Sequence, residues 1–190
     1  MKTLKCFLVL FSFVGLMLVG CSDQSQSPVS PMDQGSLEKK PTVTPFTGAD
    51  YPIPPYILQE AVVHEQGQKR IVKGLKMQER WECSSDLMDG TWVNEVNGIQ
   101  DKNTGEGTIY GKVTITPFKD VGGGVWEGEY HGKIVQSGTP GIWTCTLSGL
   151  GHGRGGTIDG MKYKVDVILN VFGFPAAGWY GTFSGTIYSH

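Results

Sequence analysis

The feature that most constrains the fold of this chain is an alternation of apolar and polar side chains that recurs from about residue 58 onward. In the clearest run, one face carries Leu75, Met77, Glu79, Trp81 and Cys83. Because successive side chains of a strand point to opposite faces, a period of two predicts half-buried β-strands. Further alternating runs occupy residues 91–97, 108–116, 126–134, 143–148, 161–169 and 179–187, with a weaker one at 59–65.

Turn-forming residues separate these runs. Clusters rich in Gly, Pro, Asn, Asp and Ser lie at residues 86–90, 97–107, 122–124, 137–141, 151–156 and 174–178. No helical pattern of about ten residues interrupts the strands, so consecutive strands should pair in an antiparallel meander. Closing about eight such strands on themselves removes the exposed sheet edges. We therefore expect an all-β fold, an antiparallel, about eight-stranded closed β-barrel over residues 57–190.

The N-terminus has the parts of a bacterial lipoprotein leader. Two lysines precede an apolar run at residues 7–19, and the sequence Leu-Val-Gly-Cys at residues 18–21 fits a lipobox. We expect a signal peptide over residues 1–20 and a lipid on Cys21 as the new first residue. The lipid would anchor the protein to a membrane on the extracytoplasmic side of the bacterial cell envelope, at the outer membrane where the host has one. The alternatives are an ordinary leader with a chance cysteine and a signal anchor that is not cleaved.

Residues 21–56 differ in composition from the rest of the chain. They are rich in Ser, Pro and Gln and show no hydrophobic periodicity. A segment of this kind buries too little apolar surface to offset the entropy lost on ordering. We expect a disordered, flexible tether that precedes the barrel. The alternative is that residues 51–56, Tyr-Pro-Ile-Pro-Pro-Tyr, form a polyproline segment on which a partner docks.

The charge of the chain weighs against one class of partner. The formal net charge is −2 for the full chain, and it becomes −4 when Lys2 and Lys5 are removed with the leader. A nucleic-acid-binding face needs an excess of Lys and Arg to displace the counterions of the phosphates. We therefore expect no nucleic-acid partner.

Short motifs of glycine and aromatic residues follow one another along residues 70–188. They are Cys-Ser-Ser-Asp at 83–86 with Gly-Thr at 90–91, Gly-Glu-Gly at 105–107 with Tyr-Gly at 110–111, Val-Trp-Glu-Gly at 125–128, Gly-His-Gly at 151–153 with Gly-Met at 160–161, and Gly-Thr-Ile at 185–187. With these motifs the chain resembles a group of uncharacterised bacterial secreted proteins and lipoproteins. It is also loosely similar to the allene oxide cyclase-like, calycin-type barrels. The resemblance implies a barrel, and because no cyclase catalytic pattern is present it implies no catalytic residue.

A second, shorter resemblance involves residues 90–95, Gly-Thr-Trp-Val-Asn-Glu. This segment is similar to the first strand of avidin-type biotin binders. The tryptophan–lysine ligand strand of that family is missing here, and the segment is not the first strand of the expected domain.

Cys83 and Cys145 are the two cysteines that remain in the expected exported domain after Cys6 and Cys21 are set aside. Each lies two residues after a tryptophan, on the apolar face of its strand. Oxidising compartments favour disulfides, and a bridge closing a loop of this length would contribute roughly 4 kcal/mol in the chain-entropy model. The pair is a candidate disulfide, and two separate buried thiols are the alternative.

Other chemistry-bearing patterns are weak, with one exception. Residues 149–156 contain a literal GxGxxG, but a strand rather than a helix is expected after it, which favours a turn or bulge over a phosphate site. The four histidines lack metal-ligand spacing, so we expect no metal and no cofactor. Glu79 is the exception, because it lies on an apolar face where a carboxyl must be paired or have a raised pKa. It marks either a strand end or a polar contact inside a ligand cavity.

The side chains that face the barrel interior decide between the remaining functions. We expect this set to be Glu79, Trp81, Trp126, Tyr130, Trp143, Tyr163, Trp179 and Phe183. If they fill the lumen the barrel is purely structural, and if they leave a cavity its apolar lining suits a small apolar ligand. We therefore expect a lipid-anchored barrel that binds a small apolar ligand or an envelope protein, or that is purely structural. The alternative is an isomerase- or cyclase-type enzyme acting in a barrel pocket, for which the sequence assigns no catalytic residue.

Overall fold

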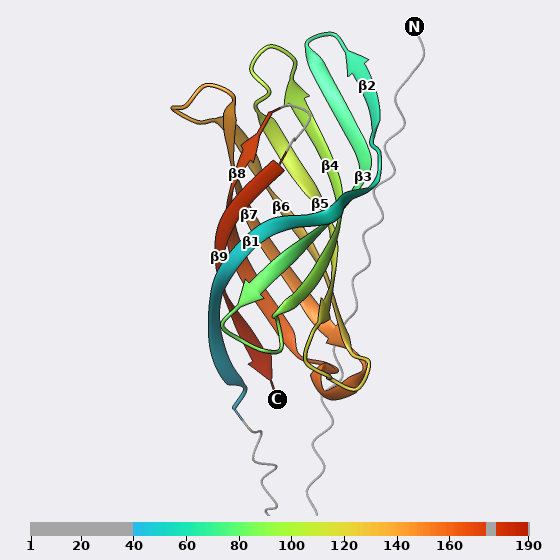
Figure 1. Cartoon of the computed structure of the whole chain (residues 1–190), viewed down its shortest axis with the longest axis vertical. Helices are drawn as coiled ribbons and strands as arrows, with labels where there is room; N and C mark the ends of the chain where they lie inside the picture. Colours follow the sequence, from blue (N-terminus) through green and yellow to red (C-terminus); the bar gives the residue numbers. More distant parts are fainter. Residues whose placement is uncertain (1–39, 174–177, 190) are drawn as a thin grey trace, which may run out of the picture. The chain divides into compact units, whose positions relative to one another are not determined.

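The computed structural model describes residues 40–173 and 178–189, and these residues form an antiparallel β-barrel (Figure 1). Its elements are β1 (Thr42–Gln59), β2 (Val62–Gln66), β3 (Lys69–Cys83), β4 (Gly90–Asp101), β5 (Gly107–Pro117), β6 (Val125–Gln136), β7 (Ile142–Arg154), the 3₁₀ turn η1 (Gly156–Ile158), β8 (Lys162–Phe172) and β9 (Gly178–Ser189). Within the described ranges, no helix has the length and apolarity needed to cross a membrane. The all-β prediction is confirmed.

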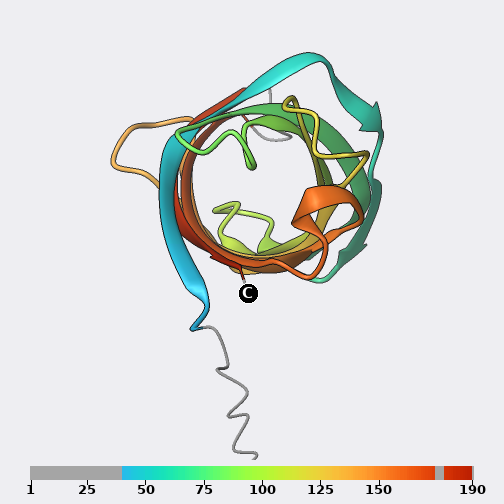
Figure 2. The ribbon, with the colours of Figure 1, turned by 90° about the horizontal axis from the view of Figure 1, so that it is seen from below.

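The strands close into a ring because β1 pairs with both ends of the meander. Going round the sheet the order is β1, β9, β8, β7, β6, β5, β4, β3, and the pairing of β1 with β3 completes the circle. Figure 2 shows this ring viewed along its axis, with β2 outside it as an extra strand on β3. The eight-stranded, closed, antiparallel barrel is therefore confirmed.

The strands are strongly staggered around the barrel. If the pairing is followed once round the sheet from Arg70 on β3, it returns to β3 at Trp81, most of the strand away. A closed sheet with such a stagger has tilted strands and a lumen wide enough for large side chains or one small ligand.

The barrel begins earlier in the chain than the sequence predicts, and this corrects the boundary between tether and barrel. Residues 42–56, predicted as tether, belong to β1, which pairs with β9 from Thr42 to Asp50 and with β3 from Gly48 to Gln59. Pro54 and Pro55 lie between Pro52 and Ile57, where the pairing with β3 is interrupted. Proline lacks an N–H, so it is tolerated at such interruptions. The prolines are the reason why the sequence pattern does not predict a strand here.

The weaker alternating run at residues 59–65 is likewise divided. Its first residue ends β1, and its later residues form β2, which pairs with β3 alone among the described strands. The signal peptide, the lipid on Cys21 and the rest of the expected tether lie outside the described residues.

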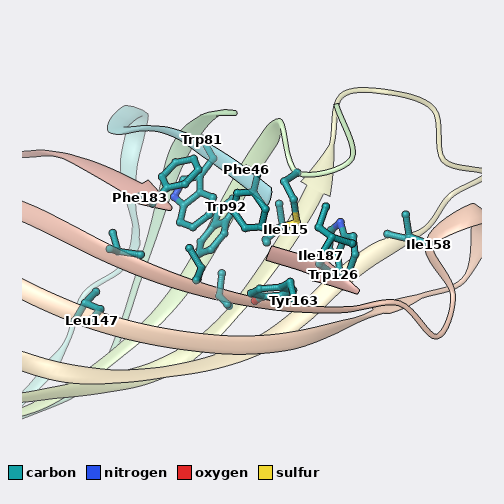
Figure 3. Close-up of a cluster of buried hydrophobic side chains, with 14 of the residues drawn as sticks. Phe46, Trp81, Trp92, Ile115, Trp126, Leu147, Ile158, Tyr163, Phe183 and Ile187 are labelled. Carbon is teal, nitrogen blue, oxygen red and sulfur yellow. The ribbon is translucent and has the colours of Figure 1, made fainter. Parts of the chain in front are cut away.

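The end of the barrel that carries the β3–β4 loop and η1, the lower end in Figure 1, is called here the packed end. Trp81 stacks between Trp92 and Phe183, with 3.7 Å between the ring centroids of Trp81 and Phe183 (Figure 3). The β3–β4 loop folds under this layer: Trp126 Nε1 donates a hydrogen bond to the Leu87 carbonyl oxygen at 2.7 Å. These contacts close the packed end.

Glycines facing the large rings make room for them in the narrow lumen. A Cβ on Gly185 would meet the ring of Phe46, and a Cβ on Gly111 would meet the ring and hydroxyl of Tyr130. Close packing leaves little space for both groups. Several of the strand glycines are therefore explained by the aromatic side chain on a neighbouring strand.

Candidate ligand cavity and its carboxyl pair

Above the packed aromatic layer the barrel is hollow. A cavity of about 580 Å³ extends upward from Trp81 and Trp92, within the range typical of small-molecule sites. Its walls are formed mainly by apolar side chains from facing strands: Val72, Leu75, Met77, Val96, Ile109, Val113, Ile134, Leu147, Val165, Val167, Leu169 and Val171. The period-two alternation of the strands places these side chains inward.

Two carboxyl groups lie side by side in the lower part of this cavity. Asp50 on β1 and Glu79 on β3 are 2% and 3% exposed, and both line the cavity. In the pairing of β1 with β3, Asp50 is opposite Trp81 and Glu79 is opposite Pro52. The two acids are therefore diagonal neighbours on adjacent strands, and their side chains are hydrogen-bonded to each other.

Neutral donors complete the hydrogen bonding of the pair. Trp81 Nε1 donates to Asp50 Oδ2 at 3.1 Å, and Trp179 Nε1 donates to Asp50 Oδ1 at 3.2 Å. The amide of Asn94 donates to Glu79 Oε1. None of the ion pairs of the described residues includes either carboxyl group. A buried charge in such a site is balanced only by dipoles.

Burial raises the pKa values of both acids. Burial raises the pKa of Asp50 to about 6, although the hydrogen bonds from Trp81, Trp179 and Glu79 oppose the rise. Burial raises the pKa of Glu79 well above its ordinary value, and the nearby charge of Asp50 raises it further, against the hydrogen bond from Asn94. Because like charges this close disfavour double ionisation, the pair holds a proton up to a higher pH than two separate, solvent-exposed carboxyl groups would.

The residues predicted to face the interior occupy three kinds of place. Five of them line the cavity: Glu79, Trp81, Tyr130, Tyr163 and Trp179. Trp126 and Phe183 are buried in the packed end and are not part of the lining. Trp143 is half-buried on β7, and its Nε1 donates a hydrogen bond to the Thr104 carbonyl oxygen at 3.0 Å. The hydroxyl of Tyr163 and Nε1 of Trp92 are buried without a hydrogen-bond partner among the described residues.

Sequence reasoning missed Asp50, Asn94 and Trp92 as parts of the site. Asp50 lies in the proline-rich segment, yet Phe46 and Asp50 are both buried and lie four positions apart in the sequence, as on one face of a strand. That even spacing is the signal in the sequence. Asn94 lies between Trp92 and Val96 in an alternating run, so its inward direction also follows from the pattern.

The candidate disulfide between Cys83 and Cys145 is wrong, because both cysteines are free. Cys83 is on β3 and Cys145 is on β7, and the ring order places these two strands on opposite walls of the barrel, equally far apart in both directions. A disulfide needs Cα atoms within about 7 Å. Burial raises the pKa of the Cys83 thiol and raises that of Cys145 to about 12.

Nothing in the described part of the chain groups three or more His, Cys, Asp or Glu residues in a way that could hold a metal ion. No protein-family model matches the chain, and comparisons with curated proteins and with solved structures give no match. The fold therefore rests on the barrel geometry itself, and the resemblances noted from the sequence stay predictions.

Proposed function

We propose that this protein binds a small, mainly apolar ligand inside the barrel. The observation that carries the proposal is the cavity of about 580 Å³ with apolar walls and a buried carboxyl pair in its lower part. Small-molecule sites have this composition, in which apolar walls supply affinity and a few polar groups fix orientation. A barrel with a purely structural role would gain stability from filling this space.

The proposed place of action is the bacterial cell envelope. It follows from the lipobox at residues 18–21. Cleavage before Cys21 and attachment of lipid there would hold the barrel on the extracytoplasmic side of a membrane, the outer one where the host has two. Two or more acyl chains anchor a protein stably, so the membrane is the expected partner of the N-terminus, and an envelope protein is a further candidate partner.

Native mass spectrometry tests ligand binding. The full chain carries Cys21→Ser, so that no lipid is attached at that position, and is compared in native and denaturing spectra. We expect an added mass in the native spectrum that extracts into organic solvent. A bare mass in preparations from several hosts would contradict the proposal and favour a protein partner.

A matched pair of variants locates the ligand. Leu169 points into the cavity, whereas its neighbour Ile168 is 52% exposed on the outer wall. We expect Leu169→Trp to abolish the added mass, because the larger side chain occupies the cavity. Ile168→Trp should retain it. Equal occupancy of both variants would place the ligand outside the cavity.

A second candidate function, an isomerase- or cyclase-type enzyme, is favoured by the carboxyl pair alone. Perturbed acids in a cavity are typical of catalytic sites, and here one carboxyl group of the Asp50–Glu79 pair is a candidate acid and the other a candidate base. The test is to incubate extracted ligand with fresh protein and to compare its structure before and after by chromatography and mass spectrometry. Conversion by the wild type but not by Glu79→Gln would support catalysis, and unchanged ligand would leave binding as the function.

A further inference from the structure

The polar part of the cavity holds two buried carboxyl groups, and none of the ion pairs of the described residues joins either of them to a basic side chain. Asp50 and Glu79 are almost fully buried, and the contacts that stabilise them come from two indole N–H groups and one amide. Attraction between opposite charges is much stronger in such surroundings than in water. A ligand with a positive charge would therefore gain most from reaching this point.

Aromatic rings lie close to the same pair of carboxyl groups. Trp92 and Trp179 line the cavity: Trp92 lies opposite Glu79 in the pairing of β3 with β4, and Trp179 donates a hydrogen bond to Asp50. Both faces of Trp81 are covered by Trp92 and Phe183. Tyr56 packs edge-on against Trp179, with 6.1 Å between the ring centroids. Tryptophan rings attract ammonium groups through their π-systems, and aromatic residues around a cation are a recurrent means of recognising amines.

The rest of the lining does not suit an anionic ligand. Glu60 and Glu65 line the cavity together with Arg70, which is the only basic side chain of the lining in the described chain. Arg70 Nη2 already lies 3.8 Å from Glu65 Oε1. A carboxylate ligand would thus bring a further acidic group to a cavity whose lining already holds more acidic than basic side chains.

We infer that the ligand is a hydrophobic amine, whose protonated nitrogen binds beside Asp50 and Glu79 while its apolar part fills the upper cavity. This inference rests on the proposed binding function and specifies the chemical class of the ligand. A neutral ligand is the competing class, because its oxygen could accept a hydrogen bond from the unpartnered Nε1 of Trp92.

Three probes of equal chain length distinguish these classes: dodecylamine, 1-dodecanol and sodium dodecanoate. Each is titrated below its aggregation threshold into the full chain carrying Cys21→Ser, and binding is measured by calorimetry and by tryptophan fluorescence. We expect the amine to bind about tenfold more tightly than the alcohol, and the carboxylate to bind most weakly. Equal binding of amine and alcohol, or tightest binding of the carboxylate, would overturn the inference and leave the proposed binding function standing.

Two isosteric variants assign the charge. Asp50→Asn combined with Glu79→Gln removes both carboxyl groups, so the amine should lose its advantage while the alcohol still binds, which also shows that the cavity is intact. Glu79→Gln keeps the Asp50 charge and can still donate a hydrogen bond to it, so the preference for the amine should persist. Glu127→Gln removes an acidic group from the outer wall and should change nothing.

Failure of the inference and failure of the proposed function are distinguishable. Retention of the amine preference in the double variant Asp50→Asn/Glu79→Gln would overturn the inference, because no carboxyl group of the pair would then be left for the amine to recognise. If none of the three probes binds, the inference is wrong, and the added mass in the native spectrum decides separately whether the cavity holds a ligand of another class.

Discussion

Burying two adjacent carboxyl groups lowers the stability of the folded protein unless other interactions stabilise them. Asp50 and Glu79 obtain this stabilisation from their hydrogen bond to each other and from the donors Trp81, Trp179 and Asn94. Replacing such a polar cluster by apolar residues is often neutral or stabilising. The pair is therefore better explained by a role in the cavity than by the stability of the barrel.

The first prediction concerns the pH dependence of stability. Both acids have pKa values raised by burial, so the folded protein binds more protons than the unfolded chain, and the free energy of unfolding falls as the pH rises through this range. For Asp50, a shift from 3.8 to about 6 corresponds to about 3 kcal/mol lost between about pH 4 and pH 7. Glu79→Gln removes one of the two titrations and the repulsion it exerts, so its curve should be flatter and the variant more stable at about pH 8.

Urea unfolding between about pH 4 and pH 8 checks this prediction, with Glu127→Gln as the control on the outer wall. The free energy of unfolding of Glu127→Gln should change with pH in the same way as that of the wild type. A Glu79→Gln curve that also runs parallel to the wild type would show that Glu79 does not titrate differently in the folded and unfolded states.

How far the sequence predicts the site can be argued from three residues. Glu79 is recognisable because a carboxyl on an otherwise apolar strand face needs an explanation. Asp50 is harder, because four prolines between residues 45 and 55 mask the even spacing that aligns it with Phe46. Asn94 follows the alternation, so its inward direction is predictable. Its hydrogen bond to Glu79 is not, because that contact depends on the register between β3 and β4.

At the scale of elements, β1 is the strand that makes the sheet a barrel. It is the only described strand that pairs with both β9 and β3. The sequence predicts the strands from β3 to β9 well, because each has a long alternation and a turn at either end. It does not predict β1, because the prolines there argue against a strand while the spacing of the buried residues favours one. The strands that pair with β1 are also far away in the sequence.

The second prediction tests the place of β1. Gly48 lies so close to β3 and to β9 that a Cβ would meet the backbone oxygen of Glu82 and the ring of Phe183. We expect Gly48→Ala to lower the free energy of unfolding by about 1–3 kcal/mol through overpacking. Gly138→Ala is the matched control, because a Cβ there meets nothing within 4 Å, and its effect should stay within about 0.5 kcal/mol. Equal effects in chemical denaturation would show that β1 does not pack against the wall as described.

At the scale of the whole molecule, the barrel combines a packed end with a hollow upper part. Period-two alternation identifies the inward residues, but it cannot tell which of them fill the lumen and which leave space. That depends on the stagger of the strands and on where a large ring faces a glycine, as Tyr130 faces Gly111. The sequence therefore does not decide whether the barrel has a cavity, and only the three-dimensional arrangement shows it.

The last prediction uses the two thiols as reporters on opposite walls. Cys145 lines the cavity and its pKa is raised to about 12 by burial, while Cys83 is half-buried outside the lining. Because the thiolate is the reactive form, N-ethylmaleimide should label Cys145 slowly in the folded protein and rapidly after unfolding. Bound dodecylamine should slow Cys145 further by covering it, and should leave Cys83 unchanged. Peptide mass mapping without reductant measures both rates, and a Cys83–Cys145 bridge, or equal protection of the two thiols by the ligand, would contradict a ligand held inside this barrel.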